Sequence, residues 1–178
     1  SVDISDIKDI AATDQFFLWH TWFSDVFEEN GGFDIVIGNP PYGLINKKQN
    51  QGEGIIVPED IFNTYKNADI YTSAKGGSLN IFRLFVIQGG SILKDNGVFC
   101  EIFPLAFTCD LSCSKLRKHI FNNYHIINIE AFPERDNPQK RVFSSAKMSV
   151  CILTFSNNKN NEPFSLRINR EPYVEKNK

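Results

Sequence analysis

Apolar runs alternate along the chain with polar segments rich in glycine and proline, and this alternation divides it into predicted strands and helices. Short runs of β-branched and aromatic residues predict four strands, at 33–38, 98–103, 126–132 and 148–155. Apolar positions three and four residues apart predict helices at 14–29, 79–94 and 111–122. The polar segment 44–77 is predicted to be a loop with one short helix near 59–68. Strands and helices in this order are typical of an α/β protein with a doubly wound sheet.

The first predicted strand stops abruptly at the tetrapeptide Asn39-Pro40-Pro41-Tyr42. Two prolines cannot continue a central strand, so the chain must leave the sheet there. In doubly wound sheets, ligands bind in the crevice beyond the carboxyl ends of the strands. The tetrapeptide is therefore a candidate site, and the alternative is a turn that ends the strand and has no further role.

The residue types of this tetrapeptide suit the binding of a planar –NH2 group. The side-chain oxygen of Asn39 and a main-chain carbonyl that precedes a proline are both hydrogen-bond acceptors. The ring-locked φ angles of Pro40 and Pro41 would hold the two acceptors rigid, so that together they could bind both hydrogens of one amine. Tyr42 adds a flat face on which a base could stack, a contact that contributes about 1–3 kcal/mol per base.

The overall composition is that of an ordinary globular protein. Of the 178 residues, 42% are hydrophobic and 22% are charged, which excludes wholesale disorder. No apolar run reaches the 18 or so residues of a membrane span, and the first residues carry no secretion signal. We therefore expect a cytoplasmic protein with no membrane partner.

The charge distribution is uneven, although the net charge is only -2. Residues 115–147 carry seven lysines and arginines against three acidic residues, so this part of the chain could contact phosphates. The alternative is that the charged residues form ordinary solvated surfaces that bind no phosphate.

The cysteines and histidines do not suggest a metal site or a disulfide scaffold. The four cysteines, at positions 100, 109, 113 and 151, lack the paired spacing of a zinc site and are too few for a disulfide framework. We expect them to be reduced and to bind no metal. We expect structural roles for the three histidines, His20, His119 and His125.

Residues 32–42 resemble motif IV of the N6-adenine DNA methyltransferases, in the class often fused into type IIG restriction-modification enzymes. Three further segments follow in the order of that family. Residues 79–85 resemble its motif V helix, 97–104 the strand that closes at a proline, and 142–153 motif VIII with its strand. The similarity covers roughly residues 16–155. It implies a Rossmann-like class I fold dependent on S-adenosyl-L-methionine, present here as the second half of the doubly wound sheet.

The resemblance also implies a substrate and the residues that bind it. The substrate would be double-stranded DNA with one adenine flipped out of the helix. The Asn39 side chain and the Pro40 carbonyl would accept hydrogen bonds from the adenine N6 amine, and Tyr42 would stack on the base. Phe143 would cover the other side or the edge of the base, which requires a space between Phe143 and Tyr42. Lys147 would lie near the base, and a solvated lysine is the alternative.

For the cofactor, the resemblance implies that Pro41 and Phe85 border the adenine ring of S-adenosyl-L-methionine. Phe85 is equally explicable as a core residue of its helix. The family's glycine-rich motif I, which binds the methionine end of the cofactor, is not found in the chain. We therefore expect residues 1–156 to be a partial catalytic domain and 157–178 an edge segment or the start of the next region. The missing N-terminal half and the target-recognition domain would be partners from the same polypeptide, and the fragment alone would be inactive.

Three other functions remain open. Enzymes that methylate a glutamine amide in translation release factors use the same tetrapeptide, because the acceptor is again a planar –NH2 group. A methyltransferase of ribosomal RNA bases is another alternative. The third is a remnant that binds nucleic acid without catalysis. The recognised DNA sequence, a fused nuclease and the oligomeric state cannot be predicted from the sequence.

Overall fold

The computed structural model describes residues 17–46, 54–159 and 162–169 and contains one five-stranded and one two-stranded sheet. The strands of the larger sheet are β1 (Phe33–Gly38), β4 (Leu93–Pro104), β5 (His125–Phe132), β6 (Val150–Ser156) and β7 (Ser165–Ile168). The smaller sheet pairs β2 (Ile45–Asn46) with β3 (Ile55–Ile56). The α-helices are α2 (Trp19–Trp22), α3 (Ser24–Asn30), α4 (Glu59–Asn67), α5 (Ile81–Ser91), α6 (Ala106–Cys109) and α7 (Ser114–Asn123). Two 3₁₀ turns are η1 (Asp69–Ala74) and η2 (Leu111–Cys113).

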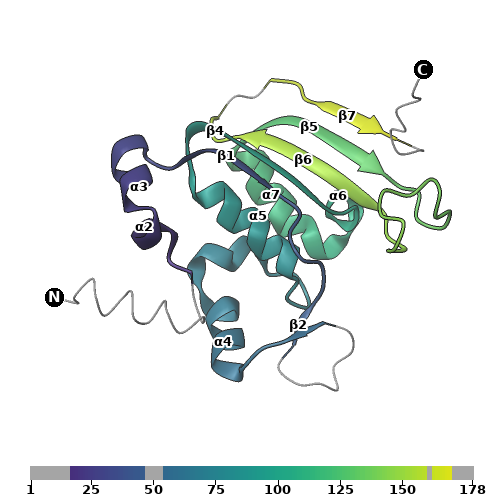
Figure 1. The fold of residues 1–178 in the computed structure, drawn as a ribbon, viewed down its shortest axis with the longest axis horizontal. Helices are drawn as coiled ribbons and strands as arrows, with labels where there is room; N and C mark the ends of the chain where they lie inside the picture. The colour runs from purple at the N-terminus through teal and green to yellow at the C-terminus, as the bar shows by residue number, and fades with distance from the viewer. Residues whose placement is uncertain (1–16, 47–53, 160–161, 170–178) are drawn as a thin grey trace.

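The larger sheet has the strand order β1-β4-β6-β5-β7, and the predicted α/β class is confirmed (Figure 1). β1 pairs with β4 in parallel, and β5 pairs with β7 in parallel. β6 runs antiparallel to both of its neighbours, β4 and β5. Parallel neighbours are usually joined by a crossover helix, whereas the loop 133–149 between β5 and β6 contains no helix. The apolar pattern predicted β6 but not its direction.

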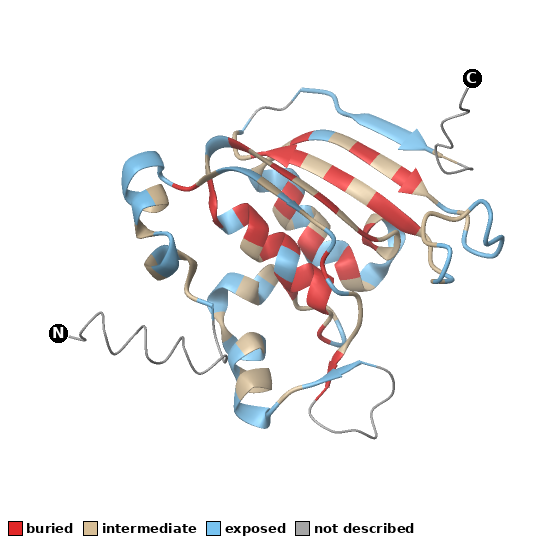
Figure 2. Ribbon diagram, in the orientation of Figure 1, coloured by how far each residue is buried: buried red, intermediate tan, exposed pale blue. Residues whose placement is uncertain are grey.

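One face of the sheet is buried under α5 and α7 (Figures 1 and 2). Side chains alternate along β4, so that Phe99 and Phe103 point toward the helices and are fully buried. Phe155 of β6 stacks on Phe99 with ring centroids 4.4 Å apart. α5 approaches the sheet closely at Gly89, where a Cβ atom would lie 2.6 Å from the Phe99 ring. These contacts make the hydrophobic core.

The opposite face of β1 is apolar and exposed. Ile35 and Ile37 are 65% and 77% exposed, and they lie in register with Val98 and Cys100 of β4, which are half-buried. Parallel strands are usually covered on both faces, and their side chains are correspondingly apolar. In the part of the chain that the structure describes, this face of β1 is left uncovered.

Several element boundaries differ from the sequence predictions. The predicted helix 14–29 is two short helices, α2 and α3, because the backbone leaves the helical region at Phe23; residues 14–16 lie outside the described ranges. Aromatic and β-branched residues are weak helix formers, which is consistent with this break. The predicted helix 79–94 ends at Ser91, and residues 93–97, ahead of the predicted strand 98–103, are part of β4, where Asn96 takes a left-handed φ of 61°. β7 was not predicted, and it lies in the segment 157–178; the proposed division after residue 156 stays a prediction.

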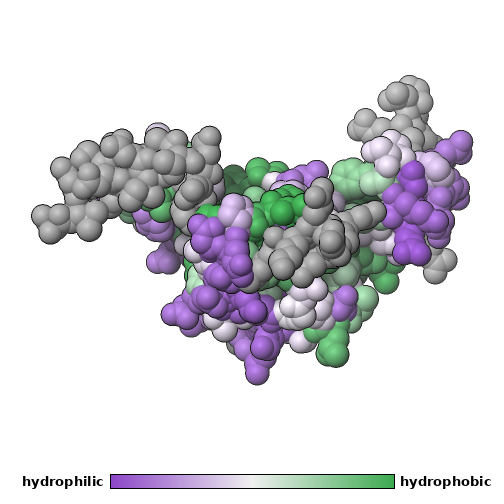
Figure 3. All heavy atoms as spheres, turned by 90° about the horizontal axis from the view of Figure 1, so that it is seen from below, coloured by the Kyte–Doolittle hydropathy of each residue, from purple (hydrophilic) through white to green (hydrophobic). Residues whose placement is uncertain are grey.

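The loop between β5 and β6 is hydrophilic and projects from the carboxyl end of β5, at the right of Figure 3. Its charged residues are Glu134, Arg135, Asp136, Lys140, Arg141 and Lys147. None of the helices in the described ranges has the length and apolar content that a membrane crossing requires.

Candidate functional site

The tetrapeptide 39–42 lies where the sequence predicts it, directly after the last residue of β1. Asn39 and Pro41 are exposed, Pro40 is buried, and Tyr42 is half-buried. A main-chain ladder holds the residues that follow, because Ile81 N donates to Gly43 O (3.0 Å) and Ile45 N donates to Leu79 O (2.9 Å). The turn is therefore anchored on one side by the sheet and on the other by the start of α5.

The Tyr42 hydroxyl is bonded at the end of the β1–β4 ladder. It lies 2.6 Å from Asn39 Oδ1 and 3.0 Å from the main-chain oxygen of Ile102. The ladder ends at the pair Gly38 and Glu101, so the Ile102 carbonyl is one residue beyond it. Burial raises the pKa of Tyr42 to about 12, with smaller contributions from Cys151 and Glu101. The hydroxyl therefore keeps its proton at neutral pH.

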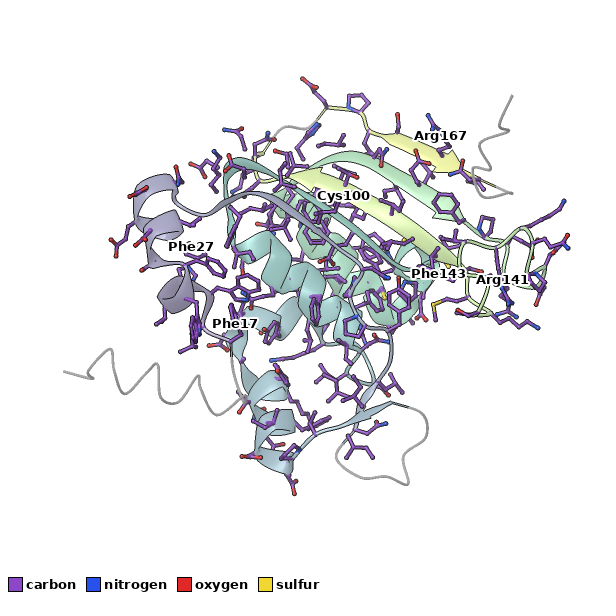
Figure 4. The ribbon with its side chains drawn as sticks, in the orientation of Figure 1. Phe17, Phe27, Cys100, Arg141, Phe143 and Arg167 are labelled. Carbon is purple, nitrogen blue, oxygen red and sulfur yellow. The ribbon has the colours of Figure 1, made fainter. Side chains whose placement is uncertain are left out.

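The tertiary structure brings Phe143 to Tyr42, although the two residues are far apart in the sequence. Their ring centroids are 6.4 Å apart and the planes are tilted by 56°. Phe143 lies at the base of the β5–β6 loop, near the ends of β4 and β6 (Figure 4). A base stacked between two parallel rings needs about 7 Å, twice the optimal carbon separation of ~3.5 Å. As placed, the two rings therefore cannot hold a base between parallel faces.

Phe85 differs from its neighbours on α5. It is 45% exposed, whereas the other six residues of 81–87 are buried. This exposure contradicts the alternative that Phe85 is a core residue of its helix. Pro41 is also exposed, so both predicted cofactor-binding residues present apolar surface to solvent.

Lys147 forms an ion pair within the β5–β6 loop. Its ammonium group lies 2.9 Å from Asp136 Oδ1, and both side chains are mostly exposed. The hydrogen bond and charge of Lys147 lower the pKa of Asp136. A second base, Arg135, lies 3.9 Å from the same carboxylate oxygen. In this structure Lys147 is therefore a solvent-exposed lysine paired with Asp136, which agrees with the alternative of a solvated lysine.

Glu101 is a buried carboxyl group that the sequence analysis did not single out. It is 5% exposed, and its Oε2 atom has no hydrogen-bond partner among the described residues. It lies against Gly38, where a Cβ atom would be 3.2 Å from Oε1. Burial raises the pKa of Glu101 to about 7. An acidic residue inside an apolar strand was the available sequence signal.

Arg83 is a second buried charged residue that was missed. Its Nη1 atom donates to the carbonyls of Gly76 (2.7 Å) and Ser112 (3.0 Å), and Nη2 donates to Ser78 O. Arg83 therefore ties the loop before α5 and the η2 turn to the helix. The sequence feature that could have identified it is an arginine inside an otherwise apolar helical run.

The four cysteines are free thiols, and two of the histidines pack on aromatic rings. No disulfide links the cysteines, and the described ranges hold no group of three or more potential metal ligands. His20 stacks on Phe27 at 3.8 Å, and His119 contacts the edge of Tyr124.

A sequence profile of the Eco57I restriction-modification methylase family matches residues 3–138. A protein of Methanocaldococcus jannaschii described as a type II restriction enzyme and methyltransferase is 27% identical over 137 residues. That match covers 77% of this chain but 10% of the relative, so the chain spans about a tenth of its length.

Solved structures share the fold at lower identity. A protein from Listeria monocytogenes described as a class I S-adenosylmethionine-dependent methyltransferase superposes with a TM-score of 0.54 at 23% identity, over 77% of this chain and 36% of that one. The DrdV–DNA complex gives a TM-score of 0.58 at 15% identity, and the match covers 83% of this chain and 16% of the DrdV chain. A nuclease-deletion mutant of the type ISP restriction-modification enzyme LlaGI, bound to a DNA substrate mimic, gives a TM-score of 0.55 at 18% identity. That match covers 76% of this chain and 14% of the LlaGI chain.

Proposed function

The chain belongs to the Eco57I restriction-modification methylase family, and from this premise we propose that it is part of a DNA methyltransferase acting on the N6 amine of a flipped adenine. The observation that carries the proposal is the position of Asn39 and Tyr42. An exposed amide follows the last residue of a sheet strand, beside an aromatic ring that is held by its hydroxyl. Such a turn can hold an exocyclic amine still while a methyl group is transferred to it.

The protein's contribution to this reaction is positioning and polarisation. The Asn39 oxygen and the Pro40 carbonyl accept the two amine hydrogens, which raises the electron density on the nitrogen. The Tyr42 ring stacks on the base and compensates part of the cost of flipping it. Phe143 contacts the base edge, consistent with its tilt of 56°.

S-adenosyl-L-methionine is the proposed methyl donor, and its sulfonium supplies an already activated methyl group. Two exposed apolar residues suit its adenine ring, Phe85 on α5 and Pro41 after β1. The exposed ring of Phe85 offers the adenine a flat apolar face for packing.

DNA is the proposed partner, and the β5–β6 loop supports this choice. The loop is hydrophilic, and Arg135, Lys140, Arg141 and Lys147 lie on it, next to Phe143. Lysines and arginines at this edge would contact backbone phosphates around the flipped nucleotide. Lys147 would first have to exchange Asp136 for a phosphate or the base.

We further propose that other parts of the same polypeptide complete the domain against β1. Its outer face carries the exposed Ile35 and Ile37, and its outer edge pairs with no described strand. The chain also spans only a tenth of the curated relative. Isothermal titration of this chain with S-adenosyl-L-methionine tests the incomplete site, and micromolar binding would refute it.

The activity is tested with the longer natural polypeptide that contains this chain. We expect transfer of labelled methyl groups to unmethylated duplex DNA, and sequencing should locate them on adenine N6. Asn39→Ala should abolish the transfer while leaving the thermal unfolding temperature unchanged, because Asn39 is exposed. An N39A enzyme that works at the wild-type rate would sink the assigned role.

Parallel assays with ribosomal RNA and with a release factor distinguish the alternatives. Methylation of a release-factor glutamine, with none of DNA, would replace the proposed function by the glutamine methyltransferase. A full-length protein that binds DNA but methylates none of the three substrates would indicate the non-catalytic remnant.

A further inference from the structure

The Tyr42 hydroxyl faces two oxygen atoms, and this arrangement bears on which way the Asn39 amide points. The hydroxyl lies 2.6 Å from Asn39 Oδ1 and 3.0 Å from the Ile102 carbonyl oxygen. A hydroxyl carries one proton and can donate it to only one acceptor at a time, although its own oxygen can also accept. One of the two close oxygen pairs is therefore left without a proton between its members.

The two neighbours of the hydroxyl differ in what they can exchange. Ile102 presents a main-chain carbonyl, which can only accept. Asn39 presents an amide, which donates from its –NH2 end and accepts at its oxygen, and a half turn about the Cβ–Cγ bond exchanges these ends. If Asn39 offers its –NH2 group to the Tyr42 oxygen, the hydroxyl proton is free to bond Ile102, and each atom of the trio meets a partner of the opposite kind.

We propose that Tyr42 is a positioning residue for Asn39, an inference that rests on the methyl transfer proposed above. Its hydroxyl donates to the Ile102 carbonyl and accepts from the Asn39 –NH2 group, so that the Asn39 oxygen points away from the protein toward the target amine. In the opposite orientation Asn39 would present hydrogens to the hydrogens of the amine, and the contact would be repulsive.

Three features of the structure fix the position of the Tyr42 hydroxyl between Asn39 and Ile102. The Tyr42 ring packs partly against the hydrophobic core, which limits where the hydroxyl can go. Ile102 belongs to β4, which pairs with strands on both sides. The main-chain bond between Ile81 and Gly43 anchors the chain directly after Tyr42.

The first test is Tyr42→Phe in the full-length enzyme, which removes the hydroxyl and keeps the ring. We expect kcat for DNA methylation to fall about 10- to 100-fold, the loss of one orienting hydrogen bond beside the reacting group. The KM for DNA should change less than about threefold, because stacking is retained. Tyr71→Phe is the matched control, since it removes a half-buried hydroxyl bonded to a side-chain amide, Gln88, outside the proposed site. Its kcat should equal that of the wild type.

The second test separates orientation from a merely structural bond. Asn39→Asp replaces the amide with a carboxylate, which presents an accepting oxygen outward in either orientation. N39D should therefore retain activity, and adding Y42F to it should cost less than a third of what Y42F costs the wild type. An inactive N39D enzyme, or an equal Y42F penalty in both backgrounds, would overturn the inference.

The outcomes also separate this inference from the proposed function. If the wild-type enzyme methylates DNA and Y42F has the same kcat, the positioning role of Tyr42 is refuted, whereas the proposed methyltransferase function is retained. If the wild-type enzyme methylates no adenine, the proposed function fails first. Thermal unfolding of each variant identifies any that has lost its fold. If Y42F unfolds, the activity of N39D decides, and if N39D unfolds, the kcat of Y42F relative to Y71F decides.

Discussion

At the residue scale, the buried carboxyl of Glu101 makes the stability of the fold depend on pH. Its folded-state pKa, about 7, lies above the ordinary value of 4.5. Between these pH values the unfolded chain loses the proton while the folded chain keeps it. The free energy of unfolding therefore falls as pH rises through this window, by up to about 3 kcal/mol, and the loss is constant above pH 7.

Glu101→Gln removes this ionisation and keeps the side-chain size. We expect E101Q to be more stable than the wild type at pH 8, by up to about 3 kcal/mol, and similar to it at pH 4. Urea unfolding across this pH range measures the difference. Glu29→Gln, an exposed change on α3, is the control and should shift stability by less than ~0.5 kcal/mol. Identical pH profiles for E101Q and the wild type would contradict the assigned environment of Glu101.

The ring of Tyr42 is predicted to act separately from its hydroxyl. Tyr42→Ala removes both, and we expect binding of a flipped base to weaken by about 1–3 kcal/mol. The measurement is the fluorescence of 2-aminopurine placed at the mapped target adenine of a duplex. Y42F should bind this duplex as the wild type does, because it keeps the ring. Equal binding by Y42A would show that the ring does not hold the base.

At the scale of elements, α5 depends on the absence of a side chain at Gly89. Alanine at an ordinary helix position stabilises by up to about 1 kcal/mol relative to glycine. At position 89 its Cβ would lie 2.6 Å from Phe99 Cε2 and 3.3 Å from Val36 Cγ1. We expect Gly89→Ala to destabilise the fold by about 1–3 kcal/mol, because the helix must move away from the sheet. Thermal unfolding checks this, with the exposed Ser91→Ala as a control within ~0.5 kcal/mol.

The elements also show where sequence patterns predict well and where they do not. The apolar runs predicted the β1, β5 and β6 strands and the α5 helix within a few residues, because one buried face produces a regular period. They predicted the existence of β4 but not its start at Leu93, which lies inside the predicted helix 79–94. The strand direction of β6 and the existence of β7 were not predictable, since pairing partners are chosen by segments distant in the sequence.

At the scale of the whole molecule, the uncovered face of β1 predicts how the chain behaves on its own. Ile37→Lys replaces one exposed apolar side chain with a charge. We expect less self-association of the isolated chain in sedimentation velocity, with a stability change under ~0.5 kcal/mol.

The same I37K change should act differently in the longer polypeptide. If another segment covers β1 there, a buried and unpaired lysine would destabilise it by several kcal/mol. Equal stability of wild type and I37K in the longer polypeptide would contradict the proposal that this face is covered.

The fold class, the family and the position of the tetrapeptide 39–42 follow from the sequence. Local periodicity, proline geometry and a contiguous motif are all properties of neighbouring residues, so they are readable without coordinates. The folded structure was needed to show that Phe143 approaches Tyr42, that Phe85 is exposed, and that Glu101 is buried with no partner for Oε2 among the described residues. Each of these depends on how segments distant in the sequence pack against one another. This packing also sets the chemistry of these residues, because burial and hydrogen-bond partners determine both the orientation and the charge of a side chain.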